Sequence, residues 1–215
     1  MNSAAQDIVN NEWNSMAGEW DDLASGYRDS FVKLLWEYTK LNSSDKRVVV
    51  DFGCGSGLLT EVMRRTSPES QYICIDAASE MVRVLQDKMR SGDWKNVKAY
   101  CVSLCNFESA AHDIRTDLVA LQGKVDLVVA SSVINFIPSN DLAATMKAVG
   151  SMLKPGGLFC HSDWPKSQES PDGFTNEKAE EVYHMGGLAK QSTAVVQMET
   201  VHHRREVFLG VAVKK

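Results

Sequence analysis

The sequence predicts an α/β fold, in which a mainly parallel sheet carries helices on both faces and ends in an antiparallel hairpin. Short apolar runs alternate along the chain with longer segments of helical periodicity, which is the pattern of successive β–α units. One of these runs, residues 48–50, is all valine and leads through Asp51 into a glycine-rich turn and a helix. Two apolar stretches near the end are joined by a short basic turn, as in paired antiparallel strands. With 215 residues, 44% of them hydrophobic, we expect a single domain over 1–215.

Each predicted element has a local signal. Residues 1–40 are helical in character, with aromatic residues spread among polar ones. Ser79 is a predicted N-cap of the helix that follows it, and Ser139 or Asn140 would cap the helix that ends before the Pro–Gly–Gly segment 155–157. The predicted strands are 47–51, 71–75, 97–102, 125–130, 158–161, 193–201 and 206–213. The predicted helices after residue 40 are 57–66, one from 79, 107–122, 142–153 and 176–185.

The glycine-rich turn is the strongest candidate for a ligand site. Glycines at 53, 55 and 57 let the backbone turn tightly and let a ligand approach it, and the N–H groups at the start of the next helix are free to bind. Asp76 stands about 20 residues further on, at the end of the second strand, where it can accept hydrogen bonds from ribose hydroxyls. This geometry suits any adenosine ligand, NAD included. The alternative for Asp76 is a carboxylate that only stabilises a helix N-terminus.

Four segments resemble a known family in order and spacing. Residues 48–57 read VVVDFGCGSG and residues 74–82 read CIDAASEMV, which resemble the first two motifs of the class I S-adenosylmethionine-dependent methyltransferases, of the small-molecule type 11/12 kind. Residues 125–132, VDLVVASS, resemble the fourth strand of that family, and residues 152–159, MLKPGGLF, its turn into the fifth strand. The resemblance covers about residues 12–215. It implies a Rossmann-like, mainly parallel seven-stranded sheet with an antiparallel C-terminal hairpin strand.

The resemblance also implies a cofactor, S-adenosyl-L-methionine, and its product S-adenosyl-L-homocysteine. Asp76 would bind the ribose, Ser103 and Leu104 would flank the adenine, and Ala130 and Ser131 would add backbone contacts. The third strand departs from the family, because no acid follows it to meet the adenine amino group. The full cofactor-binding set is Asp51, Gly53, Cys54, Gly55, Gly57, Asp76, Ala77, Ser103, Leu104, Ala130 and Ser131.

The acceptor is expected to be a small molecule. The segment 131–136, SSVINF, lacks the Asn-Pro-Pro-Tyr type of motif that accompanies attack by a planar amine, and residues 19–27 resemble the helical lid, here within 1–40, of small-molecule methyltransferases. Trp20, Tyr27, Phe136 and Trp164 would line a mostly apolar pocket, where aromatic faces also attract a sulfonium cation. For each of these four, packing in the core is the alternative.

A general base is needed only where the acceptor must lose a proton. His161 and Asp163, at the end of the fifth predicted strand, are the first candidates for this catalytic role, and His184 and Tyr183 come after them. The alternative for His161 is a strand-end histidine whose nitrogens are bonded within the fold.

Composition disfavours several other classes. The net charge of −5 and the short basic runs disfavour nucleic acid, no apolar run approaches the length of a membrane span, and the N-terminus lacks the pattern of a signal peptide. The five cysteines form no metal-binding pattern, so we expect no metal site and a reducing, cytoplasmic environment. A monomer or a homodimer is expected. A protein or RNA methyltransferase, an inactive methyltransferase-like binding protein and an NAD(P)-dependent oxidoreductase remain open as alternatives.

Overall fold

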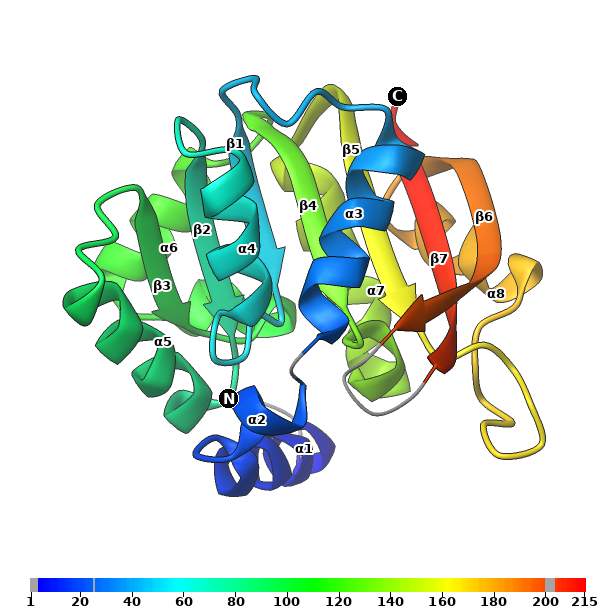
Figure 1. The fold of residues 1–215 in the computed structure, drawn as a ribbon, viewed down its shortest axis with the longest axis horizontal. Coiled ribbons are helices and arrows are strands. Elements are labelled where there is room, and N and C mark those ends of the chain that lie inside the picture. Colours follow the sequence, from blue (N-terminus) through cyan, green and yellow to red (C-terminus); the bar gives the residue numbers. More distant parts are fainter. Residues whose placement is uncertain (1–3, 25, 200–203) are drawn as a thin grey trace.

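A seven-stranded sheet forms the centre of the molecule, with the strand order β3-β2-β1-β4-β5-β7-β6 (Figure 1). A computed structural model of the chain describes residues 4–24, 26–199 and 204–215. Strands β1 to β5 pair in parallel, and β7 pairs antiparallel with both β5 and β6. This confirms the mainly parallel sheet and its antiparallel hairpin. The strands are β1 (Val48–Phe52), β2 (Gln71–Asp76), β3 (Val97–Cys101), β4 (Val125–Ser131), β5 (Leu153–Asp163), β6 (Leu188–Glu199) and β7 (Arg204–Lys214).

Helices cover both faces of the sheet (Figure 1). On one face lie α3 (Tyr27–Thr39), α4 (Leu58–Thr66) and α5 (Ser79–Ser91), and on the other lie α6 (His112–Ala120), α7 (Ser139–Met152) and α8 (Asn176–Met185). Each face has its own core: Leu35 and Met63 pack on the α3–α4 side, and Met146 and Val149 on the α7 side, all fully buried. Burying one such side chain contributes about 1.5–3 kcal/mol. Both faces of the sheet are therefore covered by packed helices, and a ligand can reach the sheet at its carboxyl edge.

The N-terminal segment lies across the carboxyl ends of the parallel strands. It contains α1 (Ala4–Met16) and α2 (Trp20–Leu23), and we call residues 4–24 the lid (Figure 1). Asn14 Oδ1 accepts a hydrogen bond from the Glu80 backbone N–H at 2.8 Å, and Asp21 Oδ1 accepts one from Ser56 Oγ at 2.5 Å. Asp21 also forms an ion pair with Lys88 of α5. The lid is thus joined to the glycine-rich turn and to α5.

Two predicted helix caps are wrong. Ser79 is the first residue of α5 rather than its cap; Ala78 occupies that position, and the Asn14 side chain supplies the acceptor for the first turn instead. In α7 the cap position is Pro138, so neither Ser139 nor Asn140 serves. Capping depends on the backbone angles just before the helix, which the residue type alone does not determine.

Other boundaries also differ. The helix predicted over 107–122 is two elements, a 3₁₀ segment η1 (Leu104–Ser109) and α6, separated by extended backbone at Ala110 and Ala111. Leu104 is buried in the core beneath the sheet edge, so tertiary packing overrides continuous helix formation here. Strand β5 is longer than 158–161, and β6 begins at Leu188 rather than at 193. The predicted end of β6 at Val201 lies outside the described residues.

Candidate active site

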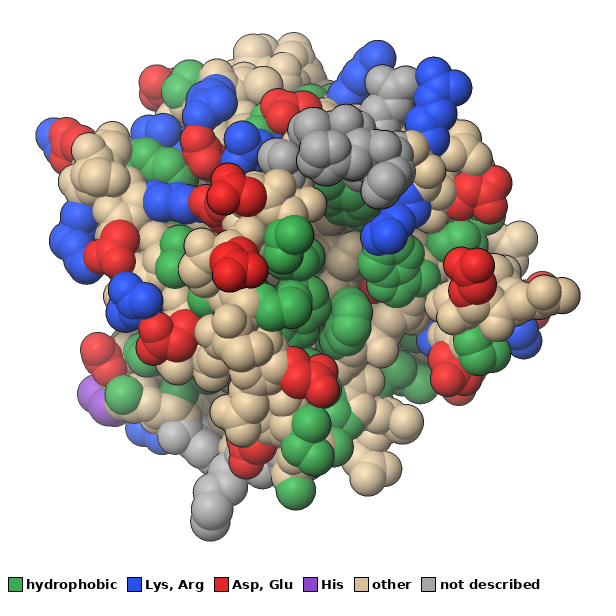
Figure 2. Space-filling view, turned by 60° about the horizontal axis from the view of Figure 1, so that its bottom comes forward, with side chains coloured by type: hydrophobic (Ala, Val, Ile, Leu, Met, Phe, Trp, Pro, Cys, Tyr) green, Lys and Arg blue, Asp and Glu red, His purple; other side chains and the backbone are tan. Residues whose placement is uncertain are grey.

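A cavity of about 310 Å³ opens at the carboxyl ends of the strands, beneath the lid. Its walls come from the lid, from the loops after β1 to β5 and from the start of β7, and Figure 2 shows hydrophobic side chains gathered around a hollow at this end of the molecule. Ligands of open α/β sheets bind at this edge, where the strand order reverses, here between β1 and β4. Of the predicted site residues, the cavity is lined by Trp20, Tyr27, Asp51, Gly53, Cys54, Gly55, Asp76, Ala77, Ser103, Leu104, Ser131, Phe136 and Trp164.

The glycine-rich turn brings its backbone to the cavity wall. Gly53 and Gly55 both have positive φ, at 67° and 53°. A Cβ on Gly53 would lie 2.3 Å from Val133 Cγ2, whereas one on Gly55 would meet nothing closer than 3.8 Å. Gly53 therefore permits the close approach of the loop after β4. A Cβ on Gly55 would meet Met81 and Trp20 at ordinary contact distance, so at Gly55 it is the positive φ that favours glycine.

Asp76 links this turn to the end of β2. Its Oδ2 accepts a hydrogen bond from the Gly55 N–H and its Oδ1 accepts one from the Ala78 N–H, both at 2.8 Å. Burial raises the pKa of this carboxyl above its ordinary value, while these two hydrogen bonds lower it. A carboxylate has about four lone-pair sites, so these backbone bonds do not use all of them and the rest can accept from the hydroxyls of a bound ribose.

Asp51 lies deeper than Asp76, with only 1% of its surface exposed. Thr60 Oγ1 donates a hydrogen bond to Asp51 Oδ2 at 2.6 Å, and burial raises the pKa of Asp51 from 3.8 to about 7. Burial, together with neighbouring thiol and carboxyl groups, also raises the pKa of the Cys54 thiol. Both groups are therefore largely neutral below pH 7, and the floor of the cavity carries less negative charge than its sequence suggests.

Beside Asp76, the loop after β3 forms the next part of the cavity wall. Ala77, Ser103 and Leu104 line it, as does Val102. The Ser103 hydroxyl lies 3.0 Å from Cys105 Sγ, so it already has a local partner. An apolar wall of this kind suits a flat heterocycle, with backbone groups rather than an acid to meet its polar edge.

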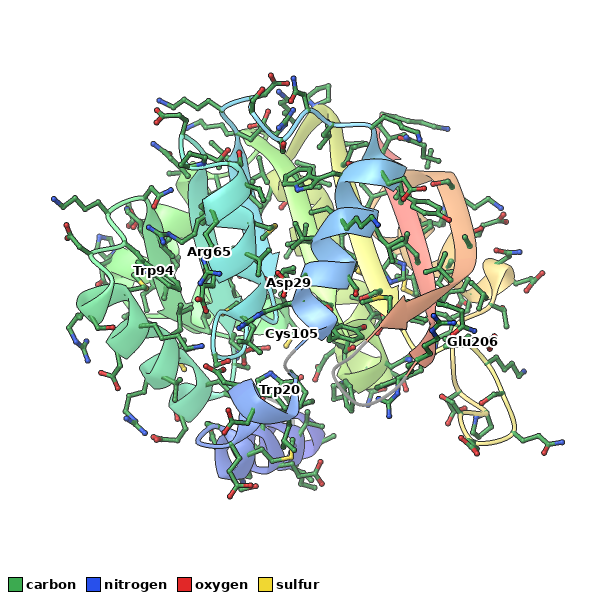
Figure 3. All side chains as sticks on the ribbon, viewed as in Figure 1. Trp20, Asp29, Arg65, Trp94, Cys105 and Glu206 are labelled. Carbon is green, nitrogen blue, oxygen red and sulfur yellow. The ribbon has the colours of Figure 1, made fainter. Side chains whose placement is uncertain are left out.

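Aromatic side chains line the cavity from the glycine-rich turn outward. Trp20 Nε1 would lie 3.8 Å from a Cβ on Gly55, and Phe136 and Trp164 form what we call the aromatic end. Trp20 of the lid lies at the carboxyl edge of the sheet (Figure 3), and Trp13 packs edge-on against both Trp20 and Phe136, with ring centroids 5.0 and 5.3 Å apart. Trp164, directly after β5, also faces this cavity. Trp13 was not among the predicted site residues, although it is one of the aromatic residues spread through the N-terminal 40 residues.

A cluster of hydroxyl groups lies between the two ends. Tyr27 Oη is 3.3 Å from Ser132 Oγ and 3.2 Å from Ser162 Oγ, and Ser131 Oγ is 3.1 Å from Ser162 Oγ. Ser132 has a φ of 57°, which is uncommon for a residue with a side chain and costs on the order of 1–3 kcal/mol. The Ser132 N–H donates to the Ser162 carbonyl at 2.6 Å, which holds this conformation. Tyr27 thus fixes the first turn of α3 to the ends of β4 and β5.

His161 and Asp163 do not line the cavity. They are fully enclosed, with 0% and 1% exposure. His161 Nδ1 donates to Asp163 Oδ2 at 2.8 Å, and the Tyr183 hydroxyl lies 2.8 Å from His161 Nε2. Asp163 Oδ1 also accepts a hydrogen bond from the Asn135 N–H at 3.1 Å. Both ring nitrogens of His161 are therefore occupied within the fold, and the two residues support the loop that carries Phe136 instead of facing a ligand.

Two further predicted residues stand behind the cavity wall. Ala130 is buried in β4, opposite His161. Gly57, with a φ of 82°, precedes α4, and a Cβ there would lie 2.4 Å from Leu85 Cδ1. Gly57 consequently lets α4 pack closely against α5.

Two arginines complete the lining and were not predicted. Arg28, in the first turn of α3, lies 3.7 Å from carboxylates of Asp29 and Glu61, and its buried Nε makes no hydrogen bond. Arg205, at the start of β7, places its guanidinium 4.5 Å from the centre of the Trp164 ring. The basic turn around Arg205 was visible in the sequence, but its proximity to the sheet edge depends on how β7 pairs with β5. Part of that turn, residues 202 and 203, lies outside the described residues.

The described part of the chain contains no cluster of His, Cys, Asp and Glu that could hold a metal ion. Nor does any helix in it have the length and apolarity to cross a bilayer.

Comparisons with known proteins agree with this geometry. A family model described as a methyltransferase domain matches residues 50–159. The ubiquinone biosynthesis O-methyltransferase of Xanthomonas euvesicatoria pv. vesicatoria (strain 85-10) is 34% identical over 128 residues, which are 59% of this chain and 46% of that protein. The malonyl-[acyl-carrier protein] O-methyltransferase of Acetivibrio thermocellus is 26% identical over 158 residues, 74% of this chain and 50% of that protein. The chain thus spans about half the length of these curated relatives.

The fold is also found in solved structures. Magnesium protoporphyrin IX methyltransferase from Synechocystis PCC 6803, crystallised with bound S-adenosylmethionine, superposes with a TM-score of 0.71 at 16% identity, over 100% of both chains. The matched family segment runs from the end of β1 into β5 and so contains the glycine-rich turn, Asp76 and the β4 loop. The chain therefore belongs to the class I S-adenosylmethionine-dependent methyltransferases.

Proposed function

We propose that the chain transfers the methyl group of S-adenosylmethionine to an oxygen atom of a small-molecule acceptor. The observation that carries this proposal is one continuous cavity with a polar, glycine-lined end at Asp76 and an aromatic end at Phe136 and Trp164. Two of the relatives are named as a ubiquinone biosynthesis O-methyltransferase and a malonyl-[acyl-carrier protein] O-methyltransferase, which supports an oxygen acceptor.

The residues at the first end fit the cofactor. Asp76 would bind the ribose hydroxyls, the backbone at Gly53 to Gly55 would lie along the methionine part, and the wall at Leu104 would receive the adenine. Arg28 would pair with the carboxylate of the methionine part, because it lines the cavity next to the helix that follows the glycine-rich turn. The cofactor supplies an activated methyl group on a sulfonium, so the protein mainly has to align the reactants and exclude water.

No general base for the acceptor stands out among the described residues that line the cavity. Among the lining residues that the structure describes there is no histidine, lysine or glutamate, and Asp51 is too deeply buried to reach an acceptor. The hydroxyls of Tyr27 and Ser132, which lie 3.3 Å apart, would orient an acceptor oxygen instead. An acceptor oxygen that is already ionised or acidic fits this arrangement, and the aromatic rings around it would keep water out.

Calorimetric titration tests the cofactor. We expect the protein to bind S-adenosylhomocysteine but not NADH, and to bind the 2′-deoxy analogue of S-adenosylhomocysteine more weakly. Asp76→Ala should weaken binding by about 1.5–3 kcal/mol, the worth of a hydrogen bond to a charged group, and should abolish the preference for the 2′-hydroxyl. Asp87→Ala, on the exposed face of α5, is the matched control and should bind like the wild type. A preference that persists in Asp76→Ala would contradict the ribose role.

The acceptor class is tested by label transfer. The protein is incubated with methyl-labelled S-adenosylmethionine and a cell extract that has been separated into small molecules, proteins and RNA. Label in the small-molecule fraction supports the proposal. Label in the protein or RNA fraction, or in none of the three, contradicts it.

A further inference from the structure

The aromatic end of the cavity contains one positive charge that no described carboxylate neutralises. Arg205 lies there, and no ion pair joins it to an acidic side chain within the described residues. The other lining cation, Arg28, sits close to Asp29 and Glu61. The two arginines therefore differ: the charge of Arg28 is partly balanced inside the protein, and that of Arg205 is available to a ligand.

The acidic side chains of the cavity lie at its other end. Asp51 and Asp76 are at the carboxyl ends of β1 and β2, whereas Arg205 is the second residue of β7, beyond β4 and β5 in the strand order. A ligand that extends from the glycine-rich turn would reach Tyr27 and Phe136 before it reached Arg205. The molecule that meets Arg205 is then the acceptor rather than the cofactor.

Trp164 keeps Arg205 in place. The Trp164 carbonyl accepts a hydrogen bond from the Phe174 N–H at 2.7 Å, which fixes the backbone at the end of β5. The guanidinium of Arg205 lies 4.5 Å from the centre of the Trp164 ring, and this contact with the ring face leaves N–H groups of the guanidinium free to donate. A planar guanidinium with free N–H groups binds an oxyanion through two parallel hydrogen bonds.

We propose that the methyl acceptor carries an oxyanion, a carboxylate or a phosphate, on a planar apolar group. Arg205 binds the oxyanion, and Trp164 and Phe136 contact the apolar group. This inference rests on the proposed function, because it identifies the acceptor of that same site. It makes Arg205 a specificity-determining residue.

The test measures binding of three probes to the protein saturated with S-adenosylhomocysteine. The probes are 2-naphthoate, 2-naphthamide and 2-naphthyl phosphate, which share one planar group and differ in charge. We expect 2-naphthoate or 2-naphthyl phosphate to bind about 10- to 100-fold more tightly than the amide, the worth of a charge-assisted hydrogen bond. The preference should fall as salt is added. The tighter of the two anions distinguishes a carboxylate acceptor from a phosphorylated one.

Variants test whether Arg205 causes the preference for the anionic probes. Arg205→Gln should lose the preference for the anion while its affinity for S-adenosylhomocysteine stays unchanged, and Arg205→Lys should keep part of it. Arg204→Gln removes the same charge one residue away, from a side chain outside the cavity lining, and should retain the preference.

Three results would overturn the inference: equal binding of anion and amide, no binding of either anion at millimolar concentration, or an equal loss in Arg204→Gln and Arg205→Gln. A protein that binds S-adenosylhomocysteine but shows one of these results refutes the acceptor assignment alone. A protein that does not bind S-adenosylhomocysteine refutes the proposed function.

Discussion

The buried carboxyl of Asp51 should make the stability of the unliganded protein depend on pH. Burial raises the pKa of Asp51 from 3.8 to about 7 in the folded chain. The unfolded chain therefore releases this proton at lower pH than the folded chain does. Between the ordinary pKa of 3.8 and the raised pKa of about 7, the folded chain binds more protons than the unfolded chain. Stability contributed by the protonated carboxyl is present below the unfolded pKa and is lost as the pH rises towards the folded pKa.

The magnitude follows from the shift. A difference of about three pKa units is equivalent to about 4 kcal/mol, at roughly 1.4 kcal/mol for each unit. About 3 kcal/mol of this should develop between about pH 5 and pH 8, where the protein can be studied conveniently. Asp51→Asn removes the titration, and its amide oxygen can still accept the hydrogen bond that Thr60 donates to the carboxyl.

Urea unfolding at several pH values measures the effect. The free energy of unfolding of the wild type should fall by about 3 kcal/mol relative to that of Asp51→Asn as the pH rises from about 5 to about 8. Other groups titrate in both proteins, so the difference between the two curves reports the titration of Asp51 together with its coupling to Asp76. Parallel curves for the two proteins would refute the assignment of a raised pKa to this carboxyl.

Two further predictions concern the walls of the site. Asp163→Ala would leave the donors of His161 and Asn135 without partners in a fully buried region. The free energy of unfolding, measured by urea denaturation, should therefore fall by about 1–3 kcal/mol for each donor. A loss below about 1 kcal/mol would contradict the buried network. Lys88→Met removes the ion pair between α5 and Asp21 of the lid, while the hydrogen bond from Ser56 to Asp21 remains. Because both partners are partly exposed, the ion pair is worth at most about 1 kcal/mol, so dissociation of S-adenosylhomocysteine in stopped-flow should speed up by up to about fivefold. The exposed control Arg83→Met on the same helix should have no effect, and an equal change in both variants would argue against a lid contact.

The predicted fold agrees with the structure because its signals are local. The valine run of β1, the glycine-rich turn and the helix at 176–185 each follow from the types of neighbouring residues and their spacing. Asp51 and Asp76 end adjacent parallel strands, so a correct assignment of β1 and β2 places both carboxyls at one edge of the sheet. The glycine-lined end of the cavity could therefore be predicted in outline.

The aromatic end was predicted less completely. Trp20, Tyr27, Phe136 and Trp164 do line the cavity, but Trp13, Arg28 and Arg205 were not selected. His161, chosen for its place at a strand end, points into the core beneath the sheet. Along a strand the side chains alternate between faces, so a shift of one residue decides whether a polar group faces the ligand or the core.

Short-range pattern was enough to predict the succession of strands and helices along the chain, the glycine-rich turn and the two acidic residues that accompany it. Which side chains share the cavity depends instead on how distant elements pack. Tyr27 and Ser132 are 105 residues apart in the chain, and Arg205 meets Trp164 only because β7 runs antiparallel to β5. Contacts between residues so far apart in the sequence depend on how whole helices and strands pack together. Residue type and local spacing do not predict that packing.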